Sequence, residues 1–426
     1  MDRDKLYDEI VAVGVEEVKR IAALLARVNV AGEAGAAEFL VRRLMFEMGA
    51  KVFGKMVERL NGGYLGGHAL CACGRRASFK EYRESWLDTI MGAIRIKRAY
   101  YYCEECAGGF SPLDEMLKAE RGRTKGLGRL ISLAGVQGPF EDASRLLKEM
   151  AGVGVSDNTV ERVSEAAGAK AIEREDKGDE ALLGEVWQRA RAQRMYVTVD
   201  GTTAQMRGYW REFKVGAIYS DAQESKRYYT TLDGSGDFML KMRKEAMRKG
   251  LARASEVVAL GDGGAWIWKE FEVNFPMATR ILDFWHLMEH VWALSHTLWG
   301  EGNKEAKRWA EGARALLKKK GGSALLEKLE RLRNKRKKKS ERDEIDKLIR
   351  YLSDNRGRTD YHQYMERGLD IGSGPVEAAC KTLIGQRLKS SGMRWTEEGA
   401  EKIARLRAIY LSGLWDKFWG FATNAA

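Results

Sequence analysis

The stretch Tyr196-Val-Thr-Val-Asp200-Gly-Thr joins a run of β-branched and aromatic residues to an aspartate that is followed by a glycine. The stretch Val257-Val-Ala-Leu-Gly-Asp262-Gly has the same form. Buried strands of a parallel sheet have such uninterrupted apolar runs, and the residue after the run lies at the rim of the sheet. The two stretches therefore predict two strands that end in Asp200 and Asp262 at one edge of a sheet.

A third acidic residue, Glu377, stands in Gly372-Ser-Gly-Pro-Val-Glu377, at the start of a helical stretch. Carboxylates from two strand ends and one helix can hold two divalent cations, Mg²⁺ or Mn²⁺, that stabilise the attacking and departing oxygens of a phosphodiester. In this hypothesis Asp200 bridges both cations, Asp262 binds one, and Glu377 completes the other. The simpler alternative is that each Asp-Gly pair forms an ordinary turn.

The segments around these acids predict the order of a larger domain. We expect strands over 195–200, 211–219 and 227–232, a helix over 236–250, and strands over 256–261 and 279–283. This order indicates a ribonuclease-H-like α/β catalytic core over 190–290, in which the first and fourth strands are neighbours. Charged helical sequence over 291–365 is then an insertion, and the core resumes over 366–426 with Glu377. The basic run over 331–339 is either a solvated face or a phosphate-tracking surface.

Asp283 also closes a strand and competes with Asp262 for the role of second acid. Because the fifth strand lies one position farther from the first, we assign Asp283 and the nearby His286 an auxiliary, supporting role. His286 and His290 are one helical turn apart, and packing or secondary hydrogen bonding explains them better than a metal pair.

Basic and aromatic residues follow Glu377 and suggest contacts with DNA. The candidates are Lys381, Arg387, Lys389 and Arg394 for phosphates and Trp395 for an unpaired base. A core tryptophan on a helix with basic outer positions is an equally good interpretation of Trp395. Cys380 is expected to be a small buried residue.

Three further regions precede the core. Residues 1–60 are expected to form a helical hairpin, and their apolar stripe packs within its own domain or mediates self-association. Residues 61–115 contain Cys71-Ala-Cys73 and Cys103-Glu-Glu-Cys106 in β-rich sequence, which predicts a zinc ribbon with four thiolate ligands. Four buried free cysteines are the alternative.

Residues 116–175 are expected to be helical, with a helix-turn-helix in which Ser156 caps the second helix. Asp157, Asn158, Thr159 and Arg162 on that helix are candidates for contacts in a DNA major groove. Plain packing of two helices is the rival interpretation.

Composition agrees with a large α+β multidomain protein that binds a polyanion. The chain has 426 residues, five cysteines and a formal net charge of +12. Lysine and arginine that neutralise phosphates release condensed counterions, so this charge favours nucleic acid as a partner. The sequence has no apolar run of about 18 residues and no signal peptide at its start, so we expect a cytoplasmic, nucleoid-associated protein of a prokaryote.

Taken together, these motifs resemble those of bacterial and archaeal insertion-sequence DDE transposases, most closely the ISKra type. The resemblance spans most of the chain. It rests on the Cys71-Ala-Cys73-Gly knuckle, Arg98-Ala-Tyr-Tyr-Tyr-Cys103, the two aspartate strand ends, Ile281-Leu-Asp283-Phe-Trp-His286 and Ile371-Gly-Ser-Gly-Pro-Val-Glu377. The element Asp283-x-x-His286 is similar to a signature of Mutator-like transposases.

The resemblance implies a catalytic triad of Asp200, Asp262 and Glu377 that uses Mg²⁺ to cleave insertion-sequence ends and transfer strands to target DNA. The implied partners are double-stranded DNA, as terminal inverted repeats and as target, and further copies of the chain in a homodimer or higher oligomer. Two alternatives stay open. One is a domesticated DNA-binding regulator that does not cleave, and the other is a structure-specific nuclease of the same fold.

Overall fold

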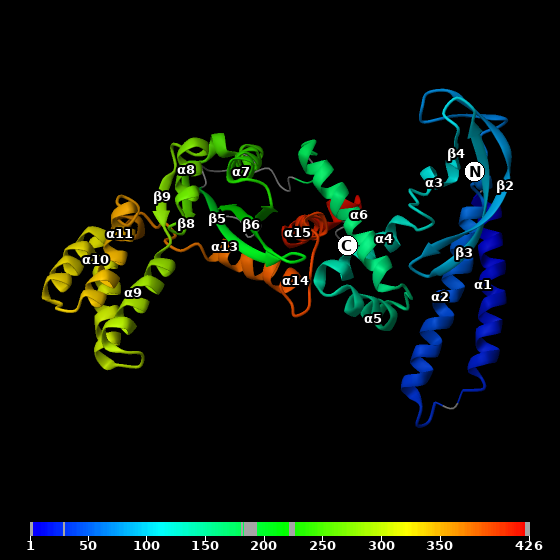
Figure 1. Cartoon of the computed structure of the whole chain (residues 1–426). Coiled ribbons are helices and arrows are strands. Elements are labelled where there is room, and N and C mark those ends of the chain that lie inside the picture. Colours follow the sequence, from blue (N-terminus) through cyan, green and yellow to red (C-terminus); the bar gives the residue numbers. More distant parts are fainter. Residues whose placement is uncertain (1–2, 29, 180–181, 183–193, 221–225, 422–426) are drawn as a thin grey trace. The chain divides into compact units, whose positions relative to one another are not determined.

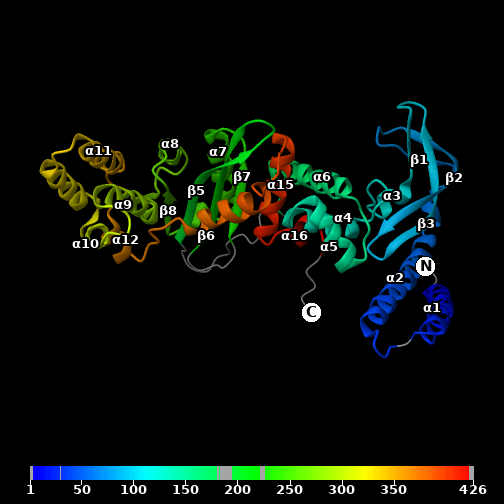
Figure 2. The same cartoon turned by 60° about the horizontal axis from the view of Figure 1, so that its bottom comes forward.

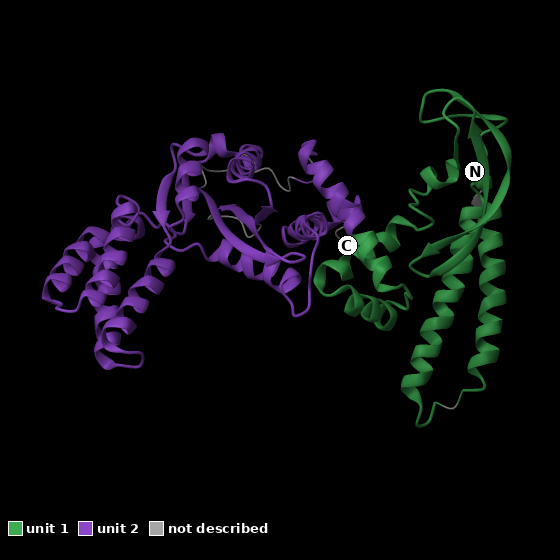
Figure 3. Ribbon diagram, viewed as in Figure 1, with its two compact units in different colours: residues 1–164 green, residues 165–426 purple. Residues whose placement is uncertain are grey.

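The computed structural model describes residues 3–28, 30–179, 182, 194–220 and 226–421. The chain divides into two compact units, residues 1–164 and residues 165–426 (Figure 3). Within the described residues each unit combines helices with a sheet, four-stranded in the first and five-stranded in the second. The expected α+β class is therefore confirmed. None of the described helices is both long and apolar enough to cross a membrane.

The first unit begins with a helical hairpin, α1 (Arg3–Leu25) and α2 (Ala34–Glu58), as the apolar spacing predicts (Figure 1). Glu17 of α1 is buried, and its carboxylate accepts hydrogen bonds from Lys51 of α2 and from Arg20. Arg20 also donates to Glu47 of α2 at 3.0 Å. Because an unpartnered buried carboxylate is costly, these contacts fix how the two helices pair.

An antiparallel sheet follows, in the order β1 (His68–Leu70), β2 (Arg76–Thr89), β3 (Gly92–Cys103) and β4 (Gly108–Phe110). Ala50 and Val57 of α2 form a buried cluster with Leu87, Ile94 and Ile96 of this sheet. The regions expected over 1–60 and 61–115 therefore share part of a core.

The helices α3 (Pro112–Met116), α4 (Lys125–Gln137), α5 (Phe140–Ala151) and α6 (Asp157–Asp176) come next. Gly152 ends α5 at a φ of +68°, a left-handed conformation that glycine adopts without strain. Ser156 begins α6, and its Oγ accepts a hydrogen bond from the Thr159 N–H at 3.2 Å. The predicted helix, turn and capped helix are confirmed as structure, and their binding to DNA stays a prediction.

The sheet of the second unit has the order β7-β6-β5-β8-β9. Its strands are β5 (Arg194–Gln205), β6 (Trp210–Ser220), β7 (Arg227–Thr231), β8 (Glu256–Gly261) and β9 (Thr279–Leu282). β5 pairs antiparallel with β6 and parallel with β8. The predicted strands and the predicted adjacency of the first and fourth are confirmed.

One boundary was predicted wrongly, because β5 does not end at Asp200. Residues 201–205 continue the strand by pairing antiparallel with residues 210–214 of β6. Apolar periodicity could not show this extension, since Gly201-Thr-Thr is not an apolar run and is held by its partner strand. Asp200 thus lies inside β5, just beyond the last residue that pairs with β8.

Helices cover both faces of this sheet (Figures 1 and 2). On one face lie α7 (Ser235–Lys249) and α8 (Ala265–Asn274), and a Cβ at Gly216 would come within 2.5 Å of the Met242 methyl of α7. The other face carries α13 (Gly374–Ala379), a π-helical turn (Cys380–Gly385), α14 (Gln386–Leu388) and α15 (Glu397–Leu411). The short helix α16 (Trp415–Trp419) follows.

The segment between β9 and α13 is helical, as expected, with α9 (Phe284–Trp299), α10 (Lys304–Lys335), α11 (Lys339–Asp354) and α12 (Tyr361–Glu366). Gly321 interrupts α10 at a φ of +75°. In the basic run 331–339, Arg333 pairs with Asp346 at 2.5 Å and Arg336 pairs with Glu341 at 3.3 Å. These two arginines therefore stabilise the insertion itself.

In the second unit, a buried ionic network joins β7, α7 and α15 to the C-terminal part of α6, which begins in the first unit. Glu175 of α6 accepts hydrogen bonds from Arg227 of β7 and, at 2.8 Å, from Arg405 of α15, while Arg227 donates to Glu245 of α7 at 3.1 Å. All four side chains are almost completely buried. Burial raises the pKa of Glu175, but the charges of Arg405 and Arg227 outweigh it and hold the pKa below its usual value.

We predict that Glu175→Gln lowers the free energy of unfolding by about 3 kcal/mol or more, because it removes the buried anion that two buried guanidinium groups share and leaves Arg227 with Glu245 and Arg405 with Glu401 at 3.7 Å. The matched control is Glu173→Gln, two residues earlier on the same helix, where an exposed carboxylate pairs with Lys177. That change should lower the free energy of unfolding by less than about 0.5 kcal/mol. Urea unfolding followed by circular dichroism measures both, and equal losses would contradict the assigned role of the network.

Candidate active site and metal centre

Two of the predicted acids lie at one level of neighbouring strands. Thr198 of β5 pairs with Leu260 of β8 in the parallel register, so Asp200 and Asp262, each two residues later, reach the same height of the sheet. Residues at equal register on parallel strands point to the same face. Asp262 follows β8 directly, and its Oδ1 accepts a hydrogen bond from the Gly264 N–H at 2.9 Å.

Asp200 is a partly buried carboxylate in a mixed environment. Its Oδ1 accepts the Gly201 N–H at 2.7 Å, and the Cys380 thiol donates to its Oδ2 at 3.3 Å. Burial raises the pKa of Asp200, the two hydrogen bonds lower it, and the charge of Asp262 raises it again, so that the pKa lies above its usual value. Asp262 is therefore close enough to act on Asp200 electrostatically.

Glu377 lies on α13, over the face of the sheet to which Asp200 points. It is exposed, and its Oε1 pairs with Lys381 Nζ at 2.5 Å. Cys380, one turn later, contacts Asp200. Burial raises the pKa of the Cys380 thiol, and the charges of Asp200 and then of Glu377 raise it further. Cys380 thus lies between the two acids, at the start of a π-helical turn of the kind often found at functional sites.

The three acids do not form a closed set of metal ligands in this structure. Within the described ranges, the only group of three or more Cys, His, Asp or Glu residues with ligand atoms all within 4.8 Å of one another is a cysteine cluster. Carboxylates of a two-cation site need not all lie that close, because the cations themselves are roughly 4 Å apart. Glu377 would exchange Lys381 for a cation in such a site.

Asp283 has a structural role that fits its auxiliary assignment. Its Oδ1 caps α9 by accepting the His286 N–H at 2.7 Å, and its Oδ2 accepts hydrogen bonds from the backbone N–H and hydroxyl of Ser373. Asp283 is only 4% exposed. Because both oxygens are engaged, Asp283 holds the segment that leads into α13 and so positions Glu377.

The insertion also contributes to the site. The centre of the His290 ring of α9 lies 4.4 Å from that of the Tyr351 ring of α11, with the two planes tilted by 40°, and the His286 ring centre lies 5.0 Å from that of His290. A Cβ at Gly263, next to Asp262, would lie 2.1 Å from the Tyr351 ring. The turn after Asp262 therefore requires glycine at position 263, and the Tyr351 ring packs against this glycine. Burial lowers the pKa of His290, which favours its neutral form.

The predicted DNA-binding residues near Glu377 divide into two groups. Lys381, Lys389 and Arg394 are exposed, and Lys389 Nζ donates to Thr202 Oγ1 at 2.6 Å. Arg387 does not fit the predicted phosphate contact, because it is fully buried with its guanidinium 4.8 Å from the Trp395 ring. For Trp395, the alternative of a core tryptophan is confirmed. Trp395 is a core residue whose Nε1 donates to the Leu388 carbonyl at 3.2 Å.

On α6, Asp157, Asn158 and Arg162 are exposed and Thr159 is partly exposed. This accessibility is compatible with the predicted groove contacts. The acidic first turn of α6 opposes them, however, since Asp157 would repel a phosphate backbone.

Sequence reasoning missed two neighbours of the acids. Cys380 follows Glu377 by three residues and so shares its helix face, which was an available signal. Tyr351 lies far from Asp262 in the chain, and no local pattern could connect them.

The four cysteines of the first unit come together at one end of its sheet. Cys71 and Cys73 follow β1, while Cys103 ends β3 and Cys106 lies in the turn before β4. The Sγ atoms of Cys71 and Cys106 are 3.6 Å apart, and those of Cys73 and Cys103 are 3.7 Å apart. A tetrahedral zinc ion with Zn–S bonds of about 2.3 Å separates its sulfurs by roughly 3.8 Å, so the cluster fits a structural zinc ion.

Backbone turns shape this cluster. The Gly74 N–H donates to the Cys71 carbonyl at 2.9 Å with Gly74 at a φ of +80°, and Ala107 has a φ of +50° in the second knuckle. Hydrogen bonds from Cys71 first, and then from Cys103 and Cys73, raise the pKa of Cys106 to about 12. The Cys106 thiol therefore stays protonated at neutral pH without a metal, and zinc binding there would release its proton.

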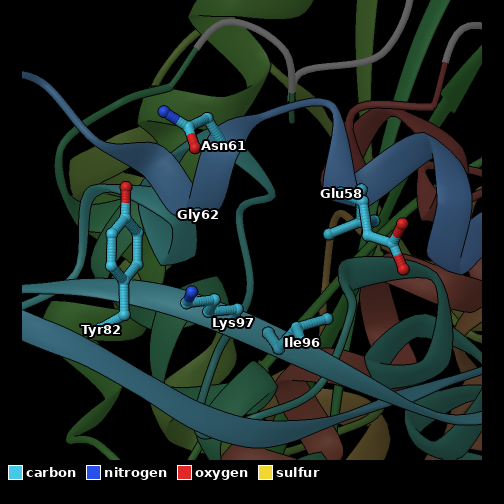
Figure 4. Close-up of a pocket in the computed structure, with 7 residues that line it drawn as sticks. Glu58, Asn61, Gly62, Tyr82, Ile96 and Lys97 are labelled. Carbon is cyan, nitrogen blue, oxygen red and sulfur yellow. The ribbon is translucent and has the colours of Figure 1, made fainter.

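A separate cavity of about 290 Å³ lies in the first unit, between the end of α2 and the β2–β3 hairpin (Figure 4). Its lining includes Glu58, Asn61, Tyr82 and Lys97. The Lys97 ammonium lies 4.5 Å from the Tyr82 ring centre. None of the predicted site residues lines this cavity.

These features define an α+β protein with two aspartates at one level of a five-stranded sheet and a four-cysteine cluster on a second sheet. A profile of the uncharacterised protein family UPF0236 matches residues 40–418. The chain belongs to this family. No curated protein matches its sequence. Since family membership brings no known activity here, the function has to be argued from the site.

We predict that the purified protein contains one zinc ion per chain and that Cys103→Ser abolishes this content and destabilises the first unit. Cys380→Ser is the matched control, because Cys380 lies outside the cluster and its loss should leave zinc unchanged. Elemental analysis together with thermal unfolding in the presence of a chelator measures both effects. Zinc retained by the Cys103 variant would contradict the assignment.

We also predict that Asp200→Asn stabilises the protein at pH 7, by about 0.5–2 kcal/mol as is common for stabilising substitutions. The folded-state pKa of Asp200 is raised above the ordinary value of 3.8, so the wild-type protein loses stability as pH rises through that raised pKa. The gain should vanish below pH 3.8, where both states carry the proton. Asp237→Asn on the exposed start of α7 is the control, and a destabilised Asp200 variant would refute the electrostatic argument.

Proposed function

We propose that this protein is a metal-dependent DNA transposase with a ribonuclease-H-like core, which cleaves insertion-sequence ends and transfers strands to target DNA. One observation carries the proposal: the β5–β8 register that brings Asp200 and Asp262 level, beneath the helix that bears Glu377. Fold alone would not support an activity, because one fold serves many functions. These acids therefore carry the proposed activity.

The arrangement of the sheet supports this proposal. Three antiparallel strands, β5 to β7, are followed by a helix and two strands parallel to β5, with helices on both faces. This agrees with the strand order expected for a ribonuclease-H-like core. The Glu377 helix follows a helical insertion, as the resemblance to DDE transposases also implies.

Each side chain has a distinct part in the proposed site. Asp200 and Asp262 supply carboxylates at one height, and Glu377 supplies a third from α13. Two bound Mg²⁺ or Mn²⁺ ions would polarise the phosphodiester and activate its attacker. Mutual repulsion between Asp200 and Asp262 favours cation binding, since a cation neutralises both carboxylates. Lys381 neutralises Glu377 when no cation is bound.

Double-stranded DNA is the proposed partner, as terminal repeats and as target. The exposed cations Lys381, Lys389 and Arg394 lie beyond Glu377, and the net charge of +12 favours phosphate binding. The cysteine cluster and α6 are proposed to contact DNA in the first unit.

We predict that the full chain nicks DNA bearing its own flanking ends when Mg²⁺ or Mn²⁺ is present. Asp200→Asn, Asp262→Asn and Glu377→Gln should each lower the cleavage rate at least about 1,000-fold, because each removes a ligand of the catalytic cations. Asp237→Asn and Glu366→Gln are exposed controls that should keep full activity. Nick mapping on labelled DNA measures the rate, and cleavage by the Asp200 variant would remove Asp200 from the mechanism.

The same experiment separates the rival functions. Specific binding to these ends that survives loss of all three acids, with no cleavage by the wild-type protein, would identify a DNA-binding regulator. Equal cleavage of branched DNA of unrelated sequence would identify a structure-specific nuclease.

A further inference from the structure

The α1–α2 hairpin carries an apolar surface that its own fold leaves uncovered. On α1, Tyr7, Val11, Val15 and Val18 are all exposed. Successive helix residues turn by about 100°, so these four side chains lie within an arc of about 80°. The buried residues Glu17 and Ile21 lie outside this arc.

A second exposed stripe lies on α2 and consists of Val41, Met45 and Met56, within an arc of about 60°. Measured as a rotation about its helix axis, the centre of the α1 stripe lies about 120° from Glu17. The centre of the α2 stripe lies about 110° from Lys51, and the two rotations have the same sense. Glu17 and Lys51 pair across the hairpin. Because the two helices are antiparallel, equal rotations bring both stripes to the same side.

The sheet lies on the opposite side of α2. Ala50 and Val57, which pack against β2 and β3, are rotated about 110° from Lys51 in the other sense. The seven side chains Tyr7, Val11, Val15, Val18, Val41, Met45 and Met56 therefore lie on one side of the hairpin, away from the sheet, and are here named the hairpin face. No charged residue falls within the α1 arc between Tyr7 and Val18, or within the α2 arc between Val41 and Met56.

We propose that the hairpin face binds the same face of a second copy, so that two hairpins form a four-helix bundle and the protein is a dimer. The seven residues are each between 39% and 69% exposed. This corresponds to roughly 700 Å² per copy, close to the ~800 Å² that each partner contributes to a standard stable interface.

A second copy is the occupant that the shape favours. A patch of this size rarely stays exposed in a monomer. Two helices of 23 and 25 residues present a long, nearly flat surface, and a two-fold axis matches such a surface with itself and leaves no further site open. This inference does not depend on the proposed catalytic activity.

The test measures the mass of the full chain in solution by light scattering and sedimentation at micromolar concentrations. The wild-type protein should have twice the 48.0 kDa chain mass. Val18→Glu combined with Met45→Glu should raise the dimer dissociation constant at least about 100-fold, because it buries charges in an apolar interface. Both positions are exposed, so the monomer should keep its helical circular dichroism.

Two matched variants sharpen the result. Val18→Leu keeps an apolar side chain in the hairpin face and should stay dimeric, while Val273→Glu places the same charge on an exposed valine of α8 and should leave the dimer intact. A monomeric wild-type protein, a dimer unaffected by the double substitution, or an equal loss with Val273→Glu would each overturn the proposal.

Discussion

The parallel pairing of β5 with β8 is the interaction on which the candidate site depends. Its backbone hydrogen bonds hold two segments about sixty residues apart in one register, with Thr198 beside Leu260. A slip of one residue would turn either Asp200 or Asp262 to the opposite face of the sheet. Val197, Val199, Ala259 and Leu260 are completely buried around this pairing, so the hydrophobic core resists such a slip.

Two carboxylates of the second unit, one buried and one partly buried, have opposite electrostatic surroundings. Glu175 is surrounded by two arginines that neutralise it, and it serves to connect α6, β7, α7 and α15. Burial raises the pKa of Asp200, the hydrogen bonds from a thiol and one backbone N–H only partly offset it, and the charge of Asp262 raises the pKa further. A carboxylate kept in such unfavourable surroundings, within reach of a second one, is typical of a functional site and not of a structural ion pair.

Elements outside the sheet hold this site in place. Asp283 links α9 to the segment before α13 through Ser373, and Tyr351 of the insertion packs against Gly263. The insertion is therefore part of the wall of the site. In the first unit, a zinc ion held by the four thiols would supplement the core, because the short strands β1 and β4 bury few side chains of their own.

The sequence by itself determined the elements of this protein and the acids that they carry. Apolar runs located β5 to β9, helical spacing located the hairpin, and cysteine spacing located the four-thiol cluster, because each of these signals lies within a few neighbouring residues. Only the tertiary structure decided which side chains are accessible and what they touch. Arg387 was predicted at the surface, and Trp395 either at the surface or in the core, but the two pack on each other inside the fold. Cys380 reaches Asp200, and Tyr351 reaches the Asp262 turn. The hairpin face likewise emerged only when the pairing of α1 with α2 showed which of their apolar residues remain uncovered. The physical reason is that burial and contact arise between elements distant in the chain, and local periodicity carries no record of them.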